Sequence, residues 1–205
     1  MNDWLVLGGA GFLAGAMNAV AGGGSFVSLP AMVGAGVPSL NANASSTLAL
    51  LPGAFTSGFA YRANFRPFSD VSLRALFITS LAGGLFGALL LIWTPQRAFD
   101  HLLPWLLLVG SLTFAFGRQA GRWLRARVRI APAASIALQF LLGVYGGYFG
   151  GAVGIMMMAV WSLLGATDLH VMNASRTLIV GVTNMIAAAV FVVAALSGGS
   201  RPSRC

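Results

Sequence analysis

The chain has 205 residues, of which 58% are hydrophobic and only 8% are charged. An average soluble domain carries about a quarter charged residues, so this composition argues against a soluble fold. Uncharged stretches over residues 4–61, 75–96, 130–167 and 177–200 each exceed the roughly 20 apolar residues that span a bilayer. We therefore predict an all-α fold, a polytopic bundle of transmembrane helices.

The basic residues are unevenly distributed. All 12 are arginines, the net charge is +8, and most of them fall in two polar segments, residues 62–74 and 118–129. Basic residues are typical of cytoplasmic loops, so both segments are predicted to be cytoplasmic and to contact membrane lipid. No nucleic-acid partner is expected, because no basic and aromatic reading face accompanies the arginines.

The first half of the chain is predicted to contain an interrupted helix followed by simple crossings. A helix over residues 4–21 ends at three glycines, and a short helix over 26–33 follows. The next helix covers residues 43–62. Crossings over 75–93 and 102–117 follow, joined by a short turn over 95–101.

The second half repeats the order of the first, with helices predicted over residues 132–151, 155–164 and 173–196. Asn43-Ala-Ser-Ser-Thr-Leu matches Asn173-Ala-Ser-Arg-Thr-Leu at an offset of 130 residues, and Gly24 meets Gly154 at the same offset. Counterparts of residues 71–117 do not follow, so we expect a last pair of helices to be missing. Whether the repeats are parallel or inverted stays open. The predicted organisation is a first repeat over 1–117, an arginine-rich cytoplasmic loop over 118–131, an incomplete second repeat over 132–196 and a polar tail over 197–205.

Two kinds of polar interruption are candidate binding elements. Unwound backbone survives at membrane depth only where protein buries it or water reaches it, and the start of a half-helix attracts anions. The alternative for the glycines is a kink that allows close packing. The Asn-Ala-Ser segments are predicted to start helices near the site, or simply to act as N-caps.

Arg176 replaces Ser46 of the first copy. Its planar guanidinium suits an anionic substrate, although it could instead reach the lipid headgroups or pair with Asp168. Repeated elements of this kind form the substrate site of many transporters. The predicted substrate-binding residues are Asn18, Gly22, Gly23, Gly24, Ser25, Asn43, Ser45, Asn173, Ser175 and Arg176.

Enzymatic and metal-binding functions are not expected. No motif links Ser25 to either histidine, His101 or His170, and the single cysteine is Cys205. The four aspartates are predicted near the membrane surfaces, so no intramembrane proton relay is expected. We predict no cofactor, no metal and a small anionic substrate.

These residues also resemble a known family. Gly15-Ala-Met-Asn-Ala-Val-Ala-Gly-Gly-Gly-Ser-Phe-Val-Ser-Leu-Pro30 and the two Asn-Ala-Ser segments are similar to the sulfite exporter TauE/SafE family, as is Gly146-Gly-Tyr-Phe-Gly-Gly-Ala-Val-Gly154. The resemblance implies a multi-pass transporter of the bacterial inner membrane that moves sulfite or related organosulfur anions. We expect export by alternating access, the alternative being a non-transporting membrane subunit or scaffold. The oligomeric state is left open.

Overall fold

A computed structural model describes residues 3–20, 22–61, 72–125, 132–151, 153–163, 166 and 168–198. Most of these residues are helical and none of them lies in a strand, so the predicted all-α fold is confirmed for them. The helices are α1 (Asp3–Val20), α2 (Ser25–Gly34), α3 (Ser39–Ala60), α4 (Leu73–Trp93), α5 (Gln96–Arg125), α6 (Pro132–Tyr148), α7 (Val153–Leu163) and α8 (Leu169–Gly198).

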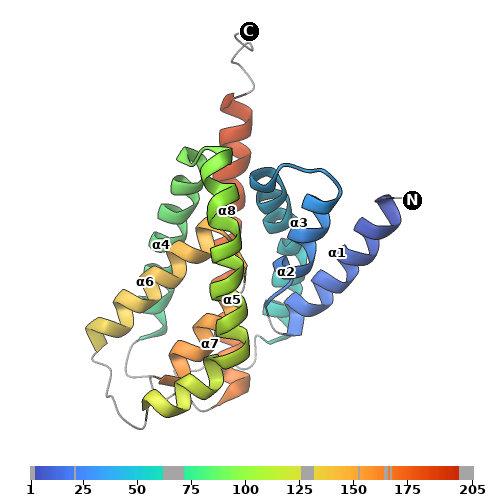
Figure 1. Ribbon diagram of the computed structural model, residues 1–205. Coiled ribbons are helices and arrows are strands. Elements are labelled where there is room, and N and C mark those ends of the chain that lie inside the picture. Colours follow the sequence, from blue (N-terminus) through green and yellow to red (C-terminus); the bar gives the residue numbers. More distant parts are fainter. Residues whose placement is uncertain are drawn as a thin grey trace.

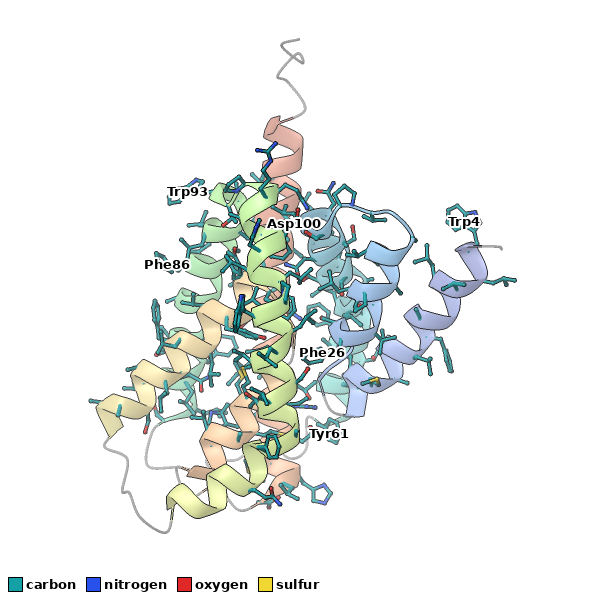
Figure 2. The ribbon with its side chains drawn as sticks, viewed as in Figure 1. Trp4, Phe26, Tyr61, Phe86, Trp93 and Asp100 are labelled. Carbon is teal, nitrogen blue, oxygen red and sulfur yellow. The ribbon has the colours of Figure 1, made fainter. Side chains whose placement is uncertain are left out.

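Three of the described helices are long and apolar enough to cross a membrane. The spans are Leu73–Trp93, Gln96–Gly117 and Leu169–Ala194. Trp4 and Trp93 are exposed at one end of the bundle, and Tyr61 lies at the other (Figure 2). Tryptophan is enriched where a helix meets the membrane surface, so these side chains suggest where one surface lies. The protein is a multi-pass membrane protein.

Helices of the two predicted repeats run in opposite directions. In Figure 1, α1 and α3 run downward, whereas α6 and α8 run upward. Helices α1, α2 and α3 pack against one another. Helices α6, α7 and α8 do the same. The two groups are joined where α3 packs against α8. The helices that the sequence pairs at an offset of 130 residues therefore run in opposite directions in the structure.

Helices α4 and α6 pack backbone to backbone through glycines. A Cβ atom on Gly87 would lie 2.1 Å from the Val144 carbonyl oxygen, and one on Gly147 would lie 2.0 Å from the Gly84 carbonyl oxygen. Any side chain at these positions would collide with main-chain atoms. Small residues allow such close approach between membrane helices. This closely packed pair lies beside α8.

Several helix boundaries differ from the predictions. Helix α3 begins at Ser39 and α8 at Leu169, so Asn43 and Asn173 lie inside their helices and the N-cap interpretation is wrong. The predicted turn over residues 95–101 is also wrong, because α5 begins at Gln96. The Pro95 carbonyl accepts hydrogen bonds from the backbone of the first turn, which starts the helix early. Helix α5 also continues past the expected end at residue 117, to Arg125.

Candidate anion-binding site

The two interruptions of the helices meet in the structure. We call the segment between α1 and α2 the first break, and the segment between α6 and α7 the second break. A Cβ atom on Gly22, in the first break, would lie 3.5 Å from Cα of Gly154, in the first turn of α7. One on Gly23 would lie 3.5 Å from the Ile155 side chain. Helix α2 begins at Ser25 and α7 at Val153, so the positive ends of two helix dipoles lie near this contact.

Each break also contacts the Asn-Ala-Ser helix of the opposite half. The Asn43 amide on α3 donates a hydrogen bond of 3.0 Å to the carbonyl oxygen of Tyr148, the last residue of α6. Gly150 has φ +73, and a Cβ atom there would lie 3.1 Å from the Thr47 hydroxyl oxygen. On the other side, the first break lies against Arg176 of α8. The halves are thus interlocked at the two breaks.

Arg176 lies between the two breaks. A Cβ atom on Gly22 would lie 2.9 Å from its Nη1, and one on Gly154 would lie 3.0 Å from its Cδ. Gly22 has φ +77, a conformation that L side chains rarely adopt, so glycine is required there by both backbone and space. The two glycines make room for the guanidinium.

The Arg176 side chain is buried and incompletely paired. It is 2% exposed, so it does not extend to the surface, and its Nη1 has no hydrogen-bond partner among the described residues. The Asp168 carboxylate instead accepts hydrogen bonds from the backbone of His170 and Val171 at the start of α8. A buried charge with a free donor is costly unless another group compensates it. The arrangement is suited to receiving an anion.

Two other polar atoms, on Asn43 beside the second break and on Ser175 next to Arg176 in α8, also lack partners among the described residues. Asn43 Oδ1 and Ser175 Oγ are buried without a hydrogen-bond partner in the part of the chain that the structure describes. Asn43 is 1% exposed and Ser175 is 0% exposed. An unsatisfied buried polar atom costs about 1–3 kcal/mol. A polar ligand could recover this energy.

The remaining predicted site residues differ in how deeply they are buried. Ser25 is buried at the start of α2, and Asn18 is partly buried beside Gly24, whose Cβ atom would lie 2.9 Å from that of Asn18. Asn173 is partly buried, and its carbonyl accepts a hydrogen bond from Thr177. Ser45 is exposed, so its prediction as a site residue is not supported by its position on α3.

The predicted site residues left out Ser46 and Thr47, which belong to the same Asn-Ala-Ser segment and are buried on α3. Ser46 is buried and forms a 2.6 Å hydrogen bond with Ser28 of α2, and Thr47 lies beside the second break. Residues three and four positions apart share one face of a helix. Starting from Asn43, this spacing selects Ser46 and Thr47. Helical periodicity could therefore have added them to the predicted site residues.

These features define a class of protein: a polytopic helical membrane protein in which two interrupted helical segments meet around a buried arginine. The family comparison agrees. The chain belongs to the sulfite exporter TauE/SafE family, whose sequence model matches residues 7–201.

Curated relatives carry transporter names. The chain is 33% identical over 153 residues to "Probable membrane transporter protein ORF9" of a Sinorhizobium species, covering 73% of this chain and 57% of that protein. It is 30% identical over 156 residues to "Probable membrane transporter protein" of Haemophilus influenzae, covering 76% and 61%. It is 28% identical over 143 residues to "Probable membrane transporter protein YfcA" of Escherichia coli K12, covering 69% and 52%. The chain thus spans between about half and three fifths of the length of these relatives. No solved structure matches it.

Proposed function

We propose that this chain carries the solute pathway of a secondary transporter for small anions, with sulfite or an organosulfur anion as substrate, in a bacterial inner membrane. The observation that carries the proposal is the buried Arg176 guanidinium, whose Nη1 is free and which lies between the breaks of the two halves. The family name and the bacterial relatives support the choice of solute class and membrane.

The proposed mechanism follows from the interlocked breaks. An anion binds to the Arg176 guanidinium through charge-assisted hydrogen bonds, which are among the strongest in proteins. Gly22 and Gly154 lie against each other beside this group. Because α1 and α6 approach the contact from opposite directions (Figure 1), rocking one half against the other opens the site to one side and then to the other. The solute crosses without a continuous pore.

Export of an anion is favoured by the membrane potential. A cell interior that is negative by about 100 mV favours the exit of one negative charge by about 2.3 kcal/mol. Neither Asp100 nor Asp168, the carboxylates whose side chains the structure describes, is buried. Transport of this kind needs no intramembrane carboxylate to bind a coupling ion.

Sulfite flux into and out of proteoliposomes tests the proposal. Arg176→Gln keeps hydrogen-bonding capacity but removes the charge. It is expected to lower sulfite flux about 10- to 150-fold, since hydrogen bonds to charged groups contribute about 1.5–3 kcal/mol. The matched control is Arg74→Gln, because Arg74 is an exposed arginine at the start of α4.

The outcomes separate the alternatives. Flux that falls for Arg176→Gln and not for Arg74→Gln supports an anion site at Arg176. Equal flux in both variants and the parent protein removes Arg176 from the pathway. A folded parent protein that moves no anion under any imposed gradient contradicts transport and favours a non-transporting membrane subunit.

A further inference from the structure

The orientation of the Asn43 amide is fixed by its neighbour. A backbone carbonyl only accepts hydrogen bonds, so the NH₂ group of Asn43 must face the Tyr148 carbonyl oxygen, 3.0 Å away. Turning the amide over would place two oxygen atoms against each other. Oδ1 therefore points away from this bond as an acceptor, and it is buried without a partner among the described residues.

The Thr47 hydroxyl, on the same helix, does not satisfy this acceptor. Thr47, one turn further along, donates its hydroxyl hydrogen to the Asn43 carbonyl oxygen at 3.0 Å. A hydroxyl has a single hydrogen to donate, so that of Thr47 is already used. Asn43 Oδ1 thus presents the negative end of an amide dipole that requires a donor from elsewhere.

The free acceptor and the free donor lie at the two ends of the same break. Asn43 binds the last residue of α6, Tyr148. Arg176 packs against Gly154, in the first turn of α7. The second break joins these two helix ends, so Asn43 and Arg176 flank it from opposite halves of the chain. A solute in contact with both residues would meet a cationic donor and a neutral acceptor.

We infer that the site selects monoanions that also carry a hydrogen-bond donor, such as hydrogen sulfite or a hydroxyalkane sulfonate, over anions with acceptors only. The inference rests on the proposed function. The anionic oxygens bind Arg176, and the O–H group donates to Asn43 Oδ1. An acceptor-only anion such as sulfate leaves Oδ1 unpaired, and a site that binds a substrate hydroxyl rejects the analogue that lacks it.

Two sulfonates of equal charge test the inference. Ethanesulfonate and 2-hydroxyethanesulfonate have the same chain length and the same sulfonate, and they differ by one hydroxyl group. Their affinities for the purified, detergent-solubilised chain are measured by calorimetry. The hydroxylated anion is expected to bind at least about tenfold more tightly, which corresponds to about 1.4 kcal/mol.

Two variants test whether Asn43 causes the preference for the hydroxylated sulfonate. Asn43→Leu, which is similar in size and has no acceptor, is expected to abolish the preference between the two sulfonates. Arg176→Gln is expected to weaken both sulfonates by a similar factor and to leave their ratio unchanged. The comparison in the parent protein remains decisive if Asn43→Leu does not fold.

The possible results keep the two proposals distinct. Equal affinities of the two sulfonates in the parent protein overturn the inference. If Arg176→Gln still weakens both, the proposed anion site stands. A preference that survives Asn43→Leu in a folded protein also overturns the inference. If neither sulfonate binds and sulfite is not transported, the proposed function itself fails and the inference fails with it.

Discussion

Replacing Gly22 with alanine perturbs the contact at the centre of the proposed site. The added Cβ atom would lie 2.9 Å from Arg176 Nη1, and the backbone there has φ +77. The substitution therefore has two effects: it strains the backbone and it displaces the guanidinium. Left-handed conformations cost a residue other than glycine roughly 1–2 kcal/mol. This strain should lower the thermal unfolding midpoint of the protein in detergent.

The displacement should appear in anion binding. Moving the guanidinium away from its position removes a hydrogen bond to a charged group, which contributes about 1.5–3 kcal/mol. Sulfite affinity is therefore expected to fall about 10- to 150-fold. Calorimetric titration with sulfite measures this change on the same preparation that is used for thermal unfolding.

Three further glycines separate the two effects. Gly36 has φ +87 and open space around its Cβ position, so Gly36→Ala introduces strain alone. A Cβ atom on Gly154 would lie 3.0 Å from Arg176 Cδ, and Gly154 is not among the glycines with positive φ, so Gly154→Ala introduces crowding alone. Gly11 has neither feature, and Gly11→Ala is expected to be neutral or slightly stabilising.

The pattern across these four variants is the test. Sulfite affinity should fall for Gly22→Ala, fall less for Gly154→Ala and stay unchanged for Gly36→Ala and Gly11→Ala. Gly36→Ala should lower the unfolding midpoint without affecting sulfite affinity. If Gly22→Ala and Gly36→Ala change affinity equally, the loss comes from general destabilisation, and the account of Gly22 as space for Arg176 is refuted.

The remaining predictions concern the scaffold and the driving force. Gln139→Leu removes two buried hydrogen bonds, to Ser80 at 2.7 Å and from Trp161 at 2.9 Å, and should destabilise the fold by about 1–2 kcal/mol in thermal unfolding without changing sulfite affinity. Thr56→Val, which removes an exposed hydroxyl bonded to its own helix, should leave both unchanged. Gly147→Ala should lower the unfolding midpoint strongly, because its Cβ atom would lie 2.0 Å from a main-chain oxygen, whereas Gly53→Ala has open space and should not. Sulfite efflux from proteoliposomes should rise when the interior is made negative; efflux that ignores potential and follows a pH gradient contradicts the proposed driving force.

The helices could be predicted from the sequence because apolar stretches and glycine runs are local signals. The crossing over residues 75–93 agrees closely with α4, Leu73–Trp93. The predicted helix starts were wrong where polar residues resembled an N-cap. Asn43 and Asn173 have side chains that favour the N-cap position but lie one turn inside their helices. The run Gln96-Arg97-Ala-Phe-Asp100-His101 contains enough polar residues to suggest a turn. In the structure it is helical and exposes Arg97, Asp100 and His101, while Phe99 is buried.

The site was only partly accessible to sequence reasoning. The glycine run and Arg176 could be identified, because a polar interruption in an apolar chain is visible locally. That both belong to one site was predicted from the repeat, but the particular contact between Gly22 and Arg176 could not be, since no local pattern reports which residues of two distant helices touch. Each half also contacts the break of the other half: Asn43 binds Tyr148, and Arg176 packs on Gly22. These contacts join residues far apart in the sequence.

The central claim is that an anion binds at Arg176, between the first and second breaks. The most direct measurement is an experimental structure of the protein with bound selenite, whose selenium atom gives an anomalous signal and whose shape resembles that of sulfite. The account predicts a single strong peak beside the Arg176 guanidinium, bordered by Gly22 and Gly154. A selenium peak elsewhere, with the space between the two breaks closed by protein atoms, would contradict it.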